Sequence, residues 1–394
     1  IDLQNNVDIS DGTGAIDNFG LIKKSAGSAA SLISTQVITE TGSTIDQQSG
    51  ASTLNLSNVL LRGDSTFTNF PSFSGAVSYE NGAKIFGNAQ MLFNGVTLTG
   101  DGVDTLFIDS TGRLHISGGG TSRFDNVLLN NAGTISMAEG GNHGILNLTN
   151  GTVITNASTG IIDLQNNVDI SDGTGAIDNF GLIKKSAGGA TSTISAQVTT
   201  ETDSIIDIQS GTLSLGGATL ALNSGSTLSG VGILSGNVNS IGGTISPGNS
   251  SSDIGTLSIT GNLSLDSNST LDIALGGTAK GTTYDLLSVN GSVVLGGDLS
   301  FKWANGFIST AGTNFDVLQS GGSMTGSFNN INDPLGVTSS STAIVPQTFQ
   351  LFRYTTDTLS ANIFNWNLTS SGNWNIAGNW DKGTVPGSGS CADL

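Results

Sequence analysis

The chain has 394 residues with 57 glycines and one cysteine; 11% of the residues are charged, and the formal net charge is −18. This acidic balance would repel nucleic-acid phosphates and anionic lipid surfaces, so we expect neither as a partner. No apolar run is long enough to span a bilayer, which predicts no membrane-spanning segment, and Cys391 alone cannot form a disulfide within the chain.

The distribution of apolar residues predicts short strands. Val, Ile, Leu and Thr recur in brief alternating runs separated by Gly, Asn, Asp and Ser, as in strands joined by tight turns. Hydrophobic residues make up 36% of the chain and aromatic residues 6%, which favours a thin core of stacked aliphatic side chains. Because the chain starts within a repeat and without Met, we expect it to be a processed form or a part of a longer polypeptide.

An internal duplication gives the most specific signal. Residues 1–27 recur unchanged at 162–188, and the similarity continues more weakly from 28–50 to 189–211. An offset of 161 residues is too long for one coil of a solenoid, whereas coils of about 20–25 residues would give about seven coils. The sequence therefore predicts an all-β fold, a right-handed parallel β-helix (β-solenoid) with Gly- and Asn-rich corners, in which stacked Asn side chains form a hydrogen-bonded ladder.

The two copies also predict which side chains face the core. Positions that stay apolar in both copies should point inward, and positions that change polarity should face solvent. The expected inward pairs are Ile33 and Ile194, Val37 and Val198, and Ile45 and Ile206. The expected outward pairs are Leu32 and Thr193, Ile38 and Thr199, and Gln47 and Ile208.

Repeats and composition divide the chain into five segments. We expect a solenoid unit at 1–161, a partial second copy at 162–232, and a more regular β-helix region at 233–332. Residues 333–362 contain Pro334 and Pro346 and are predicted to be a linker or closing strands. Residues 363–394 are either an aromatic cap or the start of a further β-helix module, the latter because Trp366, Trp374, Trp380, Gly383 and Pro386 resemble the opening of such modules in large repetitive secreted proteins.

The region from about 230 to 330 resembles a known family. It contains GGTISPGNSSSDIGTLSITGNLSL at 242–265, TLDIALGG at 270–277, the pair Tyr284-Asp285, and GTNFDVLQSG at 312–321. These segments resemble the autotransporter-associated β-strand repeat and haemagglutinin-like passenger region of bacterial surface proteins. The resemblance implies export and an extracellular or cell-surface location, and it implies no reaction. No translocating β-barrel is expected after Phe352, so the secretion route stays open.

Two short motifs are candidate sites. Arg62-Gly63-Asp64 is the integrin-recognition tripeptide, and the alternative is a corner between coils. The carboxylates of Asp101, Asp104 and Asp109 could act in a polysaccharide-cleaving site or hold Ca²⁺ as a cofactor, and the alternative is that they form turns.

The basic residues give less specific signals. Lys184-Lys185 repeats Lys23-Lys24, which indicates a repeated surface position, and we expect His115 and His143 at the surface or at corners. The sequence therefore predicts a non-catalytic structural or adhesive protein, serving as a stalk, a matrix element or a filament subunit. Its expected partners are other copies, neighbouring solenoid modules or surface glycans. The alternative function is a polysaccharide-binding or polysaccharide-cleaving β-helix.

Overall fold

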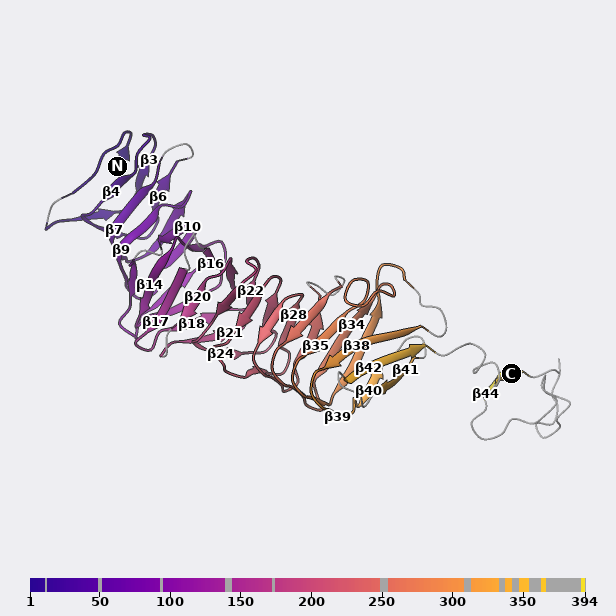
Figure 1. Ribbon diagram of the computed structural model, residues 1–394. Helices are drawn as coiled ribbons and strands as arrows, with labels where there is room; N and C mark the ends of the chain where they lie inside the picture. The colour runs from indigo at the N-terminus through magenta and orange to yellow at the C-terminus, as the bar shows by residue number, and fades with distance from the viewer. Residues whose placement is uncertain are drawn as a thin grey trace.

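The computed structural model describes residues 1–10, 13–48, 52–92, 95–138, 144–171, 174–248, 254–307 and 313–332, and the strands 337–341, 347–353, 363–365 and 391–393. Every regular element in these ranges is a β-strand. The strands stack along an elongated rod, as Figure 1 shows. The prediction of an all-β parallel solenoid is confirmed.

The main ladder follows one side of the rod, and its first strands test the predicted number of coils. Seven successive parallel pairings lead from β1 to β19, the strand that repeats the sequence of β1. Because 161 residues in seven coils give 23 residues per coil (161/7), the predicted coil length is confirmed. These strands are β1 (Asp2–Leu3), β3 (Leu21–Lys24), β6 (Ser43–Gln47), β8 (Asp64–Thr68), β10 (Lys84–Leu92), β13 (Arg113–Ser117), β16 (Thr134–Ala138) and β19 (Ile161–Gln165).

The main ladder then continues with parallel pairing through the second copy and the region after it. No step of this ladder is interrupted at the sequence boundaries 161/162 or 232/233. Its remaining strands are β22 (Leu182–Lys185), β25 (Ile205–Ile208), β28 (Thr227–Gly230), β31 (Thr244–Pro247), β34 (Thr270–Leu275), β37 (Asp298–Trp303) and β40 (Asn330–Asn332).

Two further ladders complete the coils. The second ladder comprises β12 (Thr105–Ile108), β15 (Leu128–Asn131), β18 (Val153–Asn156), β21 (Ala176–Asn179) and β24 (Gln197–Thr200), and resumes with β27 (Leu220–Leu222), β30 (Val238–Ser240), β33 (Leu263–Leu265), β36 (Val293–Leu295) and β39 (Met324–Gly326). The third ladder comprises β11 (Thr97–Thr99), β14 (Gly120–Asp125), β17 (Gly144–Thr149) and β20 (Asp169–Ser171), then β23 (Thr191–Thr193), β26 (Thr212–Ser214), β29 (Ile233–Ser235), β32 (Thr256–Ile259), β35 (Leu286–Val289) and β38 (Asn314–Ser320).

The coils of the first copy are joined to the rest through β10. Its first half pairs with β8 and β12, and its second half pairs with β9 and β13. The rod changes direction near this strand (Figure 1). The other strands of the first copy are β2 (Ala15–Asn18), β4 (Ser31–Ile33), β5 (Gln36–Thr39), β7 (Leu54–Leu61) and β9 (Ser72–Tyr79).

Parallel stacking ends after β40. β41 (Val337–Ser341) and β42 (Gln347–Arg353) are antiparallel to each other, and β42 is antiparallel to β38. Cys391 lies in β44 (Cys391–Asp393), which pairs with β43 (Ile363–Asn365). The prolines predicted to mark the linker and the predicted tryptophan motif, Pro334, Pro346, Trp366, Trp374, Trp380, Gly383 and Pro386, lie outside the described residues.

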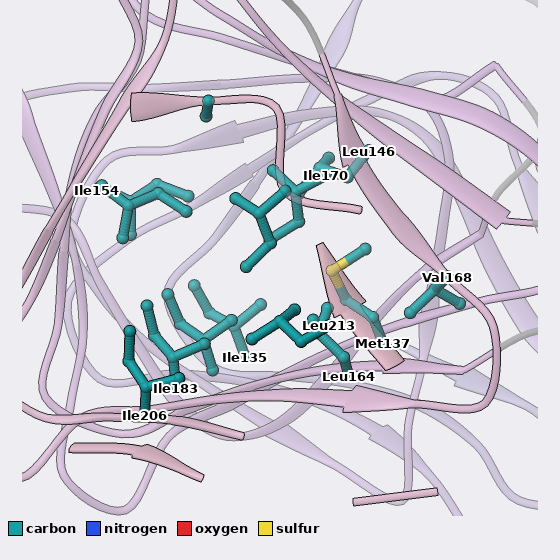
Figure 2. Packing of buried hydrophobic residues seen from close by; sticks show 14 of the residues in the cluster. Ile135, Met137, Leu146, Ile154, Leu164, Val168, Ile170, Ile183, Ile206 and Leu213 are labelled. Carbon is teal, nitrogen blue, oxygen red and sulfur yellow. The ribbon is translucent and has the colours of Figure 1, made fainter. Parts of the chain in front are cut away.

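The core is one cluster of buried, mostly aliphatic side chains that runs from Leu3 to Leu318 and includes a few aromatic rings. Successive coils contribute residues in register, so that Ile135, Ile162, Ile183 and Ile206 stack on one another along the main ladder. Figure 2 shows part of this packing. Burying each such side chain contributes about 1.5–3 kcal/mol, and the stack extends this gain along the rod.

The orientations expected from the duplication are mostly correct. The predicted inward residues are buried except Val198, which is half-buried, whereas Leu32 and Thr193 face outward as predicted. The outward prediction is wrong for Ile38 and Ile208, which are 8% and 0% exposed. Ile208 lies two positions after the buried Ile206 and opposite the buried Lys185, so period-2 alternation places it inside. Ile38 lies between the buried residues Val37 and Thr39 and is covered there.

A buried asparagine ladder joins three coils of the second ladder, as predicted. Asn131 Nδ2 donates to Asn156 Oδ1 at 2.8 Å, and Asn156 Nδ2 donates to Asn179 Oδ1 at 2.7 Å. All three side chains are fully buried. Each amide also donates to a main-chain carbonyl of a following coil, so the ladder satisfies its buried amide groups except Asn131 Oδ1, which has no hydrogen-bond partner.

Candidate interaction site

The Arg62-Gly63-Asp64 tripeptide lies at a corner and is held between coils. The guanidinium group of Arg62 binds the carboxylates of Glu40 and Glu80 at 2.8 and 3.0 Å, one on each neighbouring coil. Gly63 is buried, and a Cβ there would come 2.6 Å from the main-chain nitrogen of Thr41. These contacts fit the corner interpretation better than an exposed receptor-binding loop.

The three candidate aspartates do not form a common site. Asp101 accepts hydrogen bonds from the N–H groups of Asp104 and Val103, and these bonds lower the pKa of Asp101. Asp109 accepts bonds from Thr111 and Ser110, chiefly from the Thr111 N–H, which lowers its pKa. Among the described residues, no three acidic, His or Cys side chains gather as a metal site. Asp101 and Asp109 therefore stabilise their own turns.

The structure contradicts a surface position for the second lysine of each pair. Lys24 and Lys185 are fully buried. Lys24 Nζ donates to the carbonyls of Asn5 and Ala26 and to Ser31 Oγ. Lys185 Nζ makes the equivalent bonds in the second copy, 161 residues further on. Residues 21–24 alternate across the strand, so Lys24 points inward with Ile22, and the three acceptors compensate its burial.

The first lysine of each pair belongs to a column of charged side chains on the outer face of the main ladder. Asp163, Lys184 and Asp207 are register partners on three successive coils. Lys184 Nζ lies 3.4 Å from Asp163 Oδ2, and Lys23 pairs with Asp2 in the first copy at 3.2 Å. Burial is the main cause of a raised pKa at Asp207. This alternation of sign stabilises stacking, because each lysine lies between two carboxylates.

His115 extends the same outer column toward the first copy. Its Nδ1 lies 2.8 Å from Ser136 Oγ, and its ring packs edge-on against Phe70. The guanidinium group of Arg113 lies over the Phe70 ring and also contacts Ser136. Burial, followed by the Arg113 charge, lowers the pKa of His115. Ser136 is fully buried, so this pair has no accessible nucleophile. His143 lies outside the described residues.

A groove of about 610 Å³ opens in the second ladder between β24 and β27. Its floor contains small or aliphatic side chains, and its polar groups are hydroxyls and amides. None of its lining residues is ionisable or aromatic. They are Thr174, Gly175, Ala176, Ser195, Ala196, Gln197, Val198, Thr199, Thr200, Leu215, Ala218, Thr219, Ala221 and Asn223. This groove is our candidate interaction site.

The first copy is closed at the equivalent position. There β5 pairs directly with β7, with Val37 opposite Val59 and Ile38 opposite Leu60. In the second copy the counterparts β24 and β27 form no ladder with each other. They meet only at one end, where Thr200 Oγ1 donates to the Ala221 carbonyl at 2.7 Å and accepts from the Asn223 N–H.

Two sequence differences account for the open groove. By strand register, Asn55 and Leu56 of β7 correspond to Ser214 and Leu215. The second copy then has two more residues before Leu220, the counterpart of Val59, and this segment contains Gly216 and Gly217, which adopt φ values of 63° and 89°. Positive φ favours glycine and interrupts a strand, so β26 and β27 are separate. Ile38 is also replaced by Thr199, which removes apolar area from the closing contact. This groove was not predicted from the sequence, although Thr199, Gly216 and Gly217 are visible in the second copy.

Comparison with known proteins assigns no family. A scan against protein-family models matches none, and a search of curated proteins finds no match. The resemblance of residues 230–330 to autotransporter passenger regions therefore stays a prediction. In the part of the chain that the structure describes, no helix has the length and apolarity needed to span a membrane.

Proposed function

We propose that the chain is a non-catalytic structural or adhesive element of a bacterial extracellular surface, serving as a stiff stalk, a matrix element or a filament subunit. The main ladder carries this proposal, because parallel pairing joins every coil to the next from β1 to β40, passing from the first half of β10 to its second half on the way. Each coil is bonded to the next through its main chain, so bending the rod would strain many hydrogen bonds at once.

The side chains support the same function. The aliphatic core, the asparagine ladder and the column of alternating charges all join one coil to the next. The polar and charged groups of the ladder and the column therefore contribute to the stacking of the coils. Such a rod provides length, and repeated weak contacts along it can sum to adhesion.

The alternative function, binding or cleaving a polysaccharide, has less support. It calls for a groove lined by carboxylates and aromatic side chains, and the groove beside β24 is lined by neither. The carboxylates of Asp101 and Asp109 are engaged in separate turns. We therefore propose the structural function in preference.

Electron microscopy of the purified chain tests this proposal. We expect straight rods, or filaments if the rods associate end to end. Rounded particles or irregular coils would contradict it. Incubating the same sample with acidic and neutral polysaccharides tests the alternative, because release of reducing ends would demonstrate cleavage and overturn a non-catalytic function.

A further inference from the structure

The groove between β24 and β27 is flanked by two strand edges that have no strand partner in the described residues. β24 pairs only with β21, and β27 pairs only with β30. On the β21 side, the N–H groups of Gln197 and Glu201 donate to carbonyls of the preceding coil. Because peptide groups alternate between the two edges of a strand, the N–H and C=O of Val198 point toward the groove.

An exposed strand edge of this kind is a template for another strand. We propose that the groove binds a short, extended polypeptide segment without acidic residues, which adds to β24 as a parallel strand through the peptide groups of Val198. The occupant belongs to a partner protein. This inference goes beyond the structural function proposed above and does not depend on it.

The charges and side chains of the groove define the occupant. Its lining is uncharged, and Asp178 is the register partner of Thr199 on the neighbouring strand, in a chain of net charge −18. An acidic segment would therefore be repelled. The small residues Ala176, Ala218 and Ala221 leave space for the side chains of an added strand.

The first copy shows which sequence complements this edge. There the end of β7, Val59–Leu61, pairs with β5, the counterpart of β24, whereas its first half pairs with β4. The segment 53–62 contains the whole of β7. The segment reads TLNLSNVLLR and contains no acidic residue. A synthetic peptide of this sequence is therefore a suitable probe, with Val59 expected opposite Val198.

Fluorescence anisotropy of the labelled peptide 53–62, titrated with the full chain, tests the proposal. We expect saturable binding, and weaker binding of a scrambled peptide. Val198→Pro removes the N–H that faces the groove and spares the bonds to β21, so it should weaken binding by about tenfold or more. Asn130→Ala, a change at a half-buried outward position of β15, outside the groove, should leave the affinity within about twofold.

A second variant protects the test against misfolding. Deletion of Gly217 and Ala218 restores the first-copy length between Leu215 and Leu220, and should close the groove and abolish binding. Circular dichroism and the Tm establish whether each variant is folded. If Val198→Pro does not fold, the variant designed to close the groove decides the outcome. Failure of the full chain to bind the peptide, or equal binding by folded Val198→Pro, would overturn the proposal. So would binding of cellohexaose in place of the peptide.

Discussion

Lys24 and Lys185 occupy the same fully buried position in the two copies, and each Nζ donates to two main-chain carbonyls and one serine hydroxyl. The acceptors are equivalent residues, 161 positions apart. Each ammonium group thus fixes the Asn-Asn turn of the preceding coil to its own coil. A buried cation here acts as a cross-link between coils.

Replacing Lys185 by Met should destabilise the rod. The apolar stem stays in place, but the carbonyls of Asn166 and Ala187 lose a buried donor, so we expect a loss of about 2–4 kcal/mol. The matched control is Lys184→Met on the same strand, which breaks a partly exposed ion pair and should cost about 1 kcal/mol or less. Chemical denaturation measures both. Equal losses for the two variants would show that the buried contacts are not the stabilising ones.

Amine labelling should separate the two lysines of each pair. Lys23 and Lys184 are about one-quarter exposed, whereas Lys24 and Lys185 are fully buried. We expect an acylating reagent to modify the first lysine of each pair in the native chain and all four in denaturant, as read by mass spectrometry. Mass spectrometry cannot distinguish the identical peptides of the two copies, but this does not affect the result because we expect the same modification in both copies. Rapid native modification of the second lysine would contradict its burial.

The asparagine ladder can be tested by an isosteric change. Asn156→Asp keeps an acceptor for Asn131 but cannot donate to Asn179 Oδ1 or to the Leu182 carbonyl. We expect a loss of about 2–4 kcal/mol at neutral pH, and a smaller loss in acid, where a protonated carboxyl can donate again. Asn130→Asp, the same change at a half-buried outward position, is the control and should stay within about 0.5 kcal/mol. Similar losses from both variants would argue against the ladder.

The sequence predicted features that repeat from coil to coil. The coil length follows from the duplication, because seven pairings separate β1 from β19. The burial of Ile33, Ile45 and their counterparts follows from period-2 alternation. The same alternation also places Lys24 inside, two positions after Ile22, but the usual preference of lysine for the surface gave the wrong prediction.

Features that depend on a single step between coils could not be predicted in the same way. The groove exists because Gly216 and Gly217 turn the chain where the first copy continues as a strand. Gly is common at corners throughout the chain, so its presence does not reveal which ladder is interrupted. The orientation of Ile208 was mispredicted for a different reason: alternation from Ile206 places it inside, but the polar Gln47 at the same position of the first copy suggested an outward side chain.

Asp285 should make stability depend on pH. Its two carboxylate oxygens accept the N–H groups of Gly255 and Ala274, and it is 1% exposed. Burial raises its pKa to about 7, against the opposing effect of these two bonds, with a smaller increase from Asp272 and a decrease from Lys302. The folded chain therefore holds a proton that the unfolded chain releases near its ordinary pKa of 3.8.

This contribution to the free energy of unfolding is complete below about pH 4 and is lost as pH rises through about 7, because the folded state binds more protons between these values. Asp285→Asn cannot ionise, so the difference in unfolding free energy between the two chains should change across this window and level off above it. Carboxylates with a lowered pKa, such as Asp101, act in the opposite direction at lower pH and cancel in this difference. Urea denaturation from pH 4 to pH 9 measures it. A difference that is constant with pH, or that changes in favour of the natural chain as pH rises, would show that Asp285 is ionised throughout and that its two N–H donors outweigh burial.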